Sequence, residues 1–160
     1  MRLKIASYLN RRLADCLDLG MQTKQAHWNI KGPSFHALHL LFDDIAEDIA
    51  GYADLIAERL VQLGGTARGT AREVAASSNL AEYPHDISTG DEHIEALSGA
   101  LAAFGAIVRE GIVDTSALDD ADAADIFTEI SRGIDKWLWM VEAHRQPGTA
   151  AKQEENTNAS

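Results

Sequence analysis

Apolar residues return at helical spacing through four long stretches of the chain, and this pattern predicts four long helices. The first helix is expected over residues 2–30, where apolar side chains recur every four residues before a Gly-Pro pair ends the pattern. Its predicted buried stripe consists of Leu9, Leu13, Leu17, Met21 and Trp28.

The second helix is predicted to begin after the Gly-Pro pair, with Ser34 as its N-cap, and to end at Gly64-Gly65. Its expected apolar stripe is Leu38, Phe42, Ile45, Ile49, Ile56 and Leu63. A long connection follows over residues 65–88, with a short helix expected at residues 71–77. The glycines of this connection favour turns, because no Gly-Lys-Ser/Thr sequence follows them to make a phosphate-binding loop.

The third helix is predicted to start after Thr89, where Glu92 completes a capping box, and to run to about Val113. The fourth begins in the acidic segment DDADAAD. Residues 1–146 are therefore interpreted as one all-α domain, a four-helix bundle with one long crossover between its second and third helices. The polar tail, residues 147–160, is expected to be disordered.

Composition and charge narrow the class of protein. The chain has 160 residues, of which 46% are hydrophobic, so it can bury a sizeable core. No apolar run approaches bilayer length and the N-terminus lacks a signal-peptide core, so we expect a cytoplasmic protein without membrane contact. The formal net charge of −11 disfavours a generic nucleic-acid binder and suits a protein that attracts cations. Cys16, the only cysteine, is expected to be a small buried residue.

The second helix carries an unusual set of metal-binding side chains. His39 and Asp43 are four residues apart, as are Asp54 and Glu58, so all four fall on one stripe of the helix. Solvated acids on a helix usually alternate with basic partners, yet residues 34–58 contain no Lys or Arg. This pattern favours a metal site over a plain solvated face.

The axial spacing prevents one helix from completing such a site. Asp43 and Asp54 are separated by roughly 16 Å along the helix axis, whereas metal ligands lie about 2 Å from the ion. His27, at the end of the first helix, can join His39 and Asp43, but the Asp54–Glu58 pair has no histidine of its own. If two copies of the second helix pack antiparallel about a two-fold axis, each acidic pair meets the partner's histidines. The spacing therefore predicts two identical sites at a dimer interface.

These residues resemble a known family. The pattern H-W-N-x-x-G-x-x-F-x-x-L-H-x-x-F-D, followed by D-x-x-x-E-R, is similar to that of the Dps proteins (DNA-binding proteins from starved cells), a branch of the ferritin-like proteins. The matching residues are His27, Trp28, Asn29, Gly32, Phe35, Leu38, His39, Phe42, Asp43, Asp54, Glu58 and Arg59. The likeness continues into the last helix, in DAADIFTEISRGIDKWLW, and covers nearly all of the chain except the tail.

The resemblance implies a ferroxidase and iron-storage protein that protects the cell from oxidative damage. It implies a dodecameric shell that oxidises Fe(II) with hydrogen peroxide and holds the ferric mineral inside. Each inter-subunit site would take two iron ions, for which zinc or manganese could substitute. His27 with the partner's Asp54 and Glu58 would hold one ion, and His39 with Asp43 the second, with Glu58 able to bridge.

Other residues receive weaker assignments from the same resemblance. Trp28 could pass an electron to the iron site, although interface packing is the favoured interpretation. Arg59 and Asp135 are expected to form an inter-subunit ion pair. Three acids near the start of the last helix are candidates for a three-fold pore that attracts cations, although acids there can also simply cap the helix. These pore candidates are Asp120, Asp122 and Asp125.

Two rival functions remain open on the sequence. A DNA-binding, nucleoid-protecting protein is possible but not favoured, because the basic residues near the N-terminus alternate with apolar ones as in an ordered helix. The second rival is an oligomeric helical protein whose acids only increase solubility. The remaining histidines, interpreted as surface or core residues, are His36, His85, His93 and His144.

Overall fold

The computed structural model describes residues 2–145 and folds them into five helices, with no strand in that range beyond an isolated bridge between Lys31 and Thr89. The helices are α1 (Arg2–Asn29), α2 (Phe35–Gln62), α3 (Ala71–Ser77), α4 (Gly90–Ala117) and α5 (Ala121–Glu142). The all-α class, the four long helices and the short helix in the connection are thus confirmed. The predicted tail, residues 147–160, lies outside the described residues.

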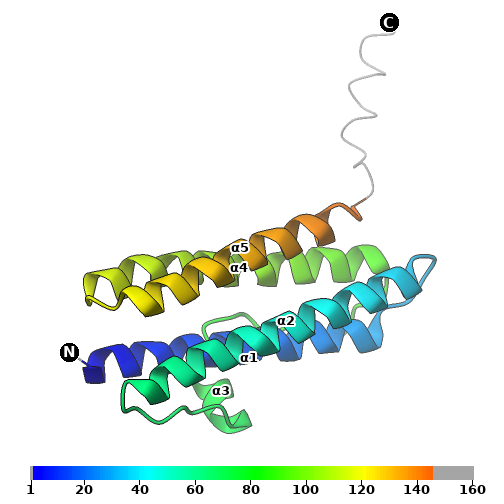
Figure 1. Ribbon diagram of the computed structural model, residues 1–160. Coiled ribbons are helices and arrows are strands. Elements are labelled where there is room, and N and C mark those ends of the chain that lie inside the picture. The colour runs from blue at the N-terminus through cyan, green and yellow to red at the C-terminus, as the bar shows by residue number, and fades with distance from the viewer. Residues whose placement is uncertain (1, 146–160) are drawn as a thin grey trace, which may run out of the picture.

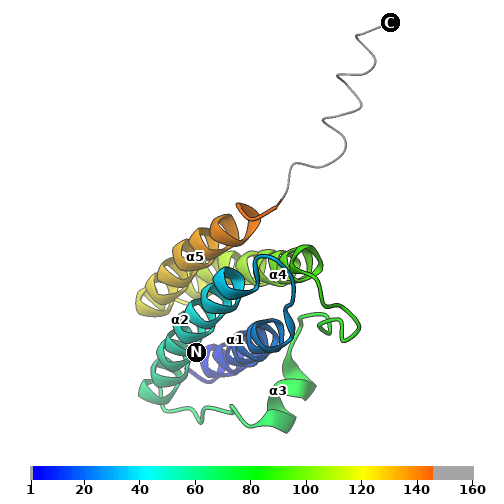
Figure 2. The same ribbon diagram turned by 90° about the vertical axis from the view of Figure 1, so that its right-hand side faces the viewer.

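The four long helices form two antiparallel pairs, α1 with α2 and α4 with α5 (Figure 1). The connection from α2 to α4 crosses the length of the bundle, so that α2 and α4 run in the same direction. Figure 2 shows the two pairs stacked as layers, with α3 lying beside α1 outside the bundle. One long crossover in a four-helix bundle is the connectivity of the ferritin-like fold.

Large apolar side chains from all four long helices meet in one core. The predicted α2 stripe is confirmed, because Leu38, Phe42 and Ile45 are fully buried and Leu63 is partly buried against the same core. Each large side chain buried in this way contributes about 1.5–3 kcal/mol relative to exposure. The largest fully buried side chains include Phe42, Phe104, Phe127, Leu9, Leu19 and Ile30.

The sequence predicted the start of α4 correctly, but the start of α2 and the end of α4 differ in detail from the predictions. At Thr89 the capping box is confirmed, since its side chain accepts a hydrogen bond from the Glu92 amide and the Glu92 carboxylate accepts one in return. Ser34 occupies the N-cap position of α2 as predicted, but its side chain makes no capping hydrogen bond. α4 runs on to Ala117 before Asp119 turns the chain with a φ of 58°, a conformation that aspartate tolerates better than most residues.

The predicted stripe of α1 leaves the core partway along the helix. Leu9 and Leu13 are buried, but Met21 is 50% exposed and Trp28 is 66% exposed. A spacing of four residues advances by about 40° per step in an α-helix. Residues at this spacing therefore move steadily around α1, and its C-terminal half presents apolar side chains at the surface.

α4 differs from the prediction that no apolar stretch of the chain approaches the length needed to cross a bilayer. It is the one described helix long and apolar enough to cross a membrane by length and composition, with a mean hydropathy of 1.5 in its most apolar window. Its place in the bundle accounts for part of this character, because α4 packs against both α5 and α1 and buries Leu97, Leu101 and Phe104.

Candidate metal centre

The turn between α1 and α2 brings His27 and His39 together. Their imidazole rings stack with centroids 3.7 Å apart and an angle of 14° between the planes. His27 is only 8% exposed, and Phe35 packs beside the His39 ring with centroids 5.0 Å apart. Two histidines that are twelve residues apart in the sequence therefore form one unit.

Reciprocal hydrogen bonds fix the orientation of both rings. The Nδ1 atom of His27 lies 2.6 Å from the backbone oxygen of His39, and the Nδ1 atom of His39 lies 2.8 Å from the backbone oxygen of His27. A carbonyl oxygen can only accept, so each Nδ1 must carry the hydrogen and donate it. In the neutral form of each ring the lone pair then lies on Nε2, which is the atom left to bind a metal ion.

Asp43 lies one turn of α2 beyond His39 and faces the same place. Its Oδ1 atom is 3.9 Å from Nε2 of His27. The same oxygen is 2.6 Å from Nζ of Lys24 on α1, and this hydrogen bond is the largest cause lowering the pKa of the Asp43 carboxyl group. Lys24 thus favours the charged form of the Asp43 carboxylate, fixes its orientation and balances its negative charge within the same chain.

Asp54 and Glu58, the other two predicted ligands, lie further along α2. Both are exposed, and about 16 Å of helix separates Asp54 from Asp43. Within residues 2–145, no group of three or more His, Cys, Asp or Glu side chains is close enough to hold a metal ion. One chain therefore stacks His27 on His39 and places Asp43 3.9 Å from His27, but it completes no metal site and does not bring the two acids to these residues.

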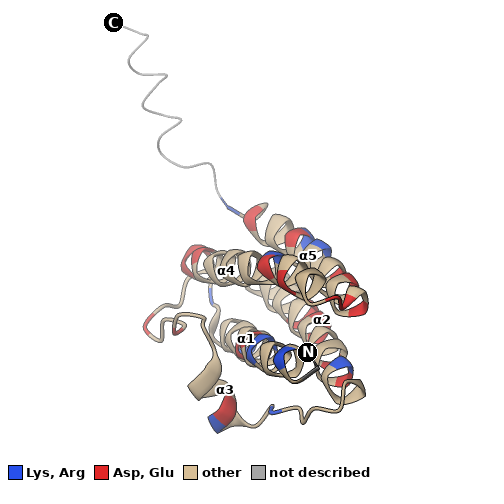
Figure 3. Cartoon of the chain, turned by 90° about the vertical axis from the view of Figure 1, so that its left-hand side faces the viewer, with Lys and Arg blue, Asp and Glu red and all other residues tan. Residues whose placement is uncertain are grey.

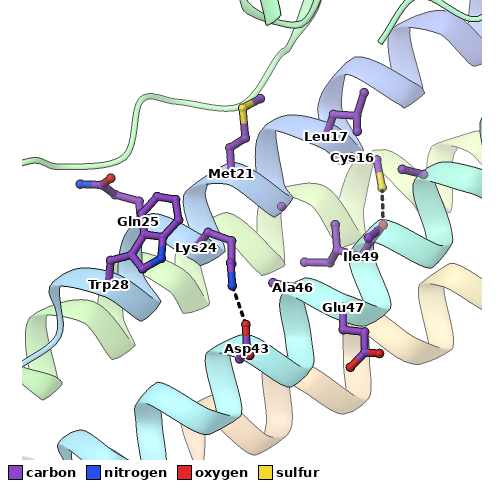
Figure 4. Close-up of a pocket in the computed structure, with 13 residues that line it drawn as sticks. Cys16, Leu17, Met21, Lys24, Gln25, Trp28, Asp43, Ala46, Glu47 and Ile49 are labelled. Atoms are coloured by element: carbon purple, nitrogen blue, oxygen red, sulfur yellow. Dashed lines mark hydrogen bonds and ion pairs between the residues drawn. The ribbon is translucent and has the colours of Figure 1, made fainter. Parts of the chain in front are cut away.

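An open groove of about 810 Å³ lies between α1 and α2 and runs from Trp28 and Asp43 at one end to Cys16 and Ala53 at the other. Figure 4 shows Trp28 and Lys24 on the α1 side and Asp43 and Glu47 on the α2 side. At its other end the groove reaches Ala53, the residue before Asp54. The exposed apolar side chains Met21 and Trp28 of α1 line this groove, together with Asp43 from α2.

Cys16 lies at the base of the groove and is not a metal ligand candidate. Its Sγ atom donates a hydrogen bond to the backbone oxygen of Ile49 over 3.5 Å. Burial is the largest cause raising the pKa of its thiol, so Cys16 stays protonated. The expectation of a small buried residue is confirmed.

The acids at the start of α5 have different surroundings. Asp120 is only 4% exposed; it caps α5 by accepting from the Ala123 amide, and it lies 2.6 Å from Nη2 of Arg59. This corrects its assignment as a pore residue, because its carboxylate is directed at Arg59 and the helix end. Asp122 lies 3.3 Å from Nη1 of Arg59 but stays exposed, as does Asp125.

Within the chain, Arg59 and Asp135 do not pair with each other. Arg59 is taken by Asp120 and Asp122, and Asp135 lies 3.2 Å from Nη1 of Arg109. In the expected pair, each partner is thus already engaged: Arg59 by two acids of its own chain and Asp135 by Arg109. Any contact between subunits would have to displace or share these partners.

The remaining histidines lie away from the groove, as expected. His93 is buried and lies 2.6 Å from the Tyr83 hydroxyl, while His85 is exposed beside Glu82 at 3.0 Å. His36 and His144 are exposed as well. None of the four joins the stacked pair.

Sequence reasoning missed two features of the site, Lys24 and the reciprocal hydrogen bonds of the histidines. Both connect different helices, so no spacing along one helix reveals them. One signal was present, because Lys24 precedes His27 by three residues and such a pair shares a helix face.

Comparison with known proteins extends the likeness beyond the site. The family model of the ferritin-like domain matches residues 6–148. The chain is 44% identical over 142 residues to the DNA protection during starvation protein of Agrobacterium fabrum, covering 89% of this chain and 88% of that relative. It is 32% identical to the protein of the same name from Brevibacillus brevis, covering 87% and 93%. The solved structure of Mycobacterium smegmatis Dps superposes with a TM-score of 0.87 at 28% identity, covering 92% of this chain and 83% of that one.

Proposed function

We propose, because this chain belongs to the Dps branch of the ferritin-like proteins, that it is a ferroxidase whose sites are shared by two subunits. It binds Fe(II), oxidises it with hydrogen peroxide and stores the ferric product inside a homo-oligomeric shell of twelve subunits. By removing Fe(II) and peroxide together, it protects the cytoplasm from their damaging reaction. Zinc or manganese can occupy the same positions, because carboxylate and imidazole donors accept all three metals.

One observation carries this proposal: a single chain places two histidines beside Asp43 and leaves Asp54 and Glu58 further along α2, next to the other end of the α1–α2 groove. The stacked histidines use their Nδ1 atoms within the chain, and Nε2 of His27 lies 3.9 Å from Asp43. Two exposed acids stand at the other end without a histidine. An antiparallel second copy over the groove supplies each end with what it lacks, and the two-fold axis repeats the arrangement.

Each ligand then has a defined part in the reaction. His27 with Asp54 and Glu58 of the partner subunit holds one Fe(II), while His39 and Asp43 hold the second, and the partner's Glu58 can bridge them. Peroxide takes one electron from each of the two Fe(II) ions. The O–O bond breaks, two protons are taken up and two water molecules leave. Open coordination positions, which this small donor set provides, allow the oxidant to approach.

Trp28 is proposed to fill the interface rather than to supply electrons. Its indole is 66% exposed and lines the groove that the partner covers. Trp28→Phe keeps a large apolar ring but removes the easily oxidised indole. With two Fe(II) bound per site, we expect stopped-flow oxidation rates within about twofold of the unchanged protein. A loss of rate with an intact assembly would instead support electron transfer from Trp28.

Lys24 is expected to compete with metal for Asp43. Since Lys24 lowers the pKa of Asp43, their ion pair persists on acidification until the pH falls through that lowered pKa. Lys24→Met keeps the length of the side chain but removes its charge. The affinity for the second metal should rise about two- to fivefold, as expected for loss of an exposed ion pair.

Calorimetric titration with Zn(II), which is not oxidised, measures this change directly. Lys31→Met is the matched control, because Lys31 is exposed and has no acidic partner among the described residues. Weaker Zn(II) binding by Lys24→Met would contradict the competition.

Asp122 and Asp125 remain the candidates for a pore that attracts cations. Both are exposed in the first turns of α5, where three copies around a three-fold axis would gather negative charge. Asp122→Asn/Asp125→Asn should slow Fe(II) uptake several-fold at low ionic strength and less at high salt. Glu129→Gln, further along α5, is the control. Equal uptake by all three proteins, measured by the growth of ferric absorbance, would refute the assignment.

DNA binding stays the second candidate, since the relatives are named for DNA protection. The basic residues near the N-terminus are only partly available for it. Arg12 is buried and pairs with Asp15 at 3.0 Å. A gel-shift assay at low salt, with the five ligands replaced, tests whether DNA is retained independently of iron.

A further inference from the structure

A second pocket, of about 490 Å³, lies at the N-terminal end of α1. It is bounded by α1, by the start of the α2–α4 connection and by α3, and shares no lining residue with the α1–α2 groove. Its polar lining residues include Ser7, Asn10, Arg11, Arg68, Glu73 and Ser77. The ferroxidase proposal assigns no function to any of them.

The wall of this pocket is held in place by the chain itself. Asn10 donates from Nδ2 to the backbone oxygen of Thr66 at 3.0 Å and accepts from the Arg68 amide at 2.9 Å. Both functions of the Asn10 carboxamide are therefore used to fasten the connection to α1. A side chain at Gly65 would meet Leu60 at 2.7 Å, so glycine is what allows the connection to lie this close. The pocket is built before any ligand arrives.

Two arginines on different walls of the pocket have no acidic partner among residues 2–145. Arg11 contacts only the Ser7 hydroxyl and the Tyr8 ring, and the Arg68 guanidinium makes no hydrogen bond or ion pair within residues 2–145. Four other arginines are paired with carboxylates: Arg12, Arg59, Arg109 and Arg145. Figure 3 shows basic positions on the first half of α1 and around α3. In a chain of net charge −11, two arginines without acidic partners among residues 2–145 line this one pocket.

We propose that this pocket binds the phosphate group of a small anion such as a nucleotide. Guanidinium groups match phosphate oxygens with paired, charge-assisted hydrogen bonds, and the hydroxyls of Ser7 and Ser77 can add neutral donors. The volume falls in the range that small-molecule sites occupy. Glu73, the one acid that lines the pocket, opposes the ligand and limits its affinity.

Titration calorimetry on the metal-free, assembled protein at low ionic strength tests the proposal. The probes are inorganic phosphate, adenosine monophosphate and a short DNA duplex. Both small probes should bind saturably, and Arg11→Gln/Arg68→Gln should weaken them at least about tenfold. Glu73→Gln should strengthen binding, because it removes a like charge from the pocket.

Two further variants separate loss of the site from loss of fold. Arg132→Gln, which removes an exposed arginine from α5, should bind as the unchanged protein does. Arg11→Lys/Arg68→Lys keeps the charge and should retain part of the affinity. Absence of saturable binding, or equal binding by Arg11→Gln/Arg68→Gln, would overturn the proposal. Binding of the duplex alone would also overturn it, since that result indicates an extended surface instead of this pocket.

Discussion

His39→Ala is expected to lower the rate of peroxide-driven Fe(II) oxidation by about a hundredfold or more. Loss of outer-shell partners of a metal site already costs about 10- to 100-fold, and His39 has two functions here. It offers its own Nε2, and its backbone oxygen and stacked ring hold His27 in place. The substitution keeps the backbone acceptor but removes the hydrogen bond to His27 and the ring that stacks on it.

The measurement is stopped-flow absorbance of ferric iron after mixing Fe(II)-loaded protein with peroxide. His36→Ala is the matched control, because His36 is exposed on the same helix and lies three residues before His39. Helix content and assembly size should be unchanged in both variants. A His39→Ala protein that oxidises iron as fast as His36→Ala would remove this residue from the site.

Asp120→Ala is expected to destabilise the protein by about 2–4 kcal/mol. The substitution removes the N-cap of α5 and leaves Arg59 without its buried partner. Asp122 can satisfy Arg59 only in part, because it lies at 3.3 Å and is exposed. Asp120 is therefore a structural residue, in contrast to the pore role that its position in an acidic segment suggested.

Asp122→Ala is the control, with an expected cost of no more than about 1 kcal/mol for an exposed pair. Both variants are compared with the unchanged protein by denaturant unfolding at equal subunit concentration, since assembly contributes to the stability of an oligomer. Equal unfolding midpoints for Asp120→Ala and Asp122→Ala would show that the buried pair and the cap contribute nothing.

The helices were predictable because local signals set them. The short helix α3 has the bounds that the sequence indicated, and the Thr89 capping box is present. Glycine pairs, proline and the spacing of apolar residues determine the helix boundaries within a few residues of their own positions. The exposure of Met21 and Trp28 was missed because a spacing of four drifts around the helix.

The surroundings of the candidate ligands were less predictable. The spacing of His39, Asp43 and Asp54 along α2 could be read directly, and it already indicated that one chain is insufficient. The contact of Lys24 with Asp43 and the burial of Asp120 against Arg59 depend on how helices pack. These contacts join residues 19 and 61 positions apart, and helical periodicity carries no information at such separations.

A mixing experiment tests the shared site most directly. One chain carries His27→Ala/His39→Ala, the other carries Asp54→Ala/Glu58→Ala, and each should be inactive alone. After dissociation and reassembly, random pairing makes about half of the dimers mixed. If two subunits build each site, each mixed dimer contains one intact site and one site that lacks all the replaced ligands. About a quarter of the Fe(II) oxidation should therefore return. No recovery, in assemblies shown to contain both chains, would contradict the shared site.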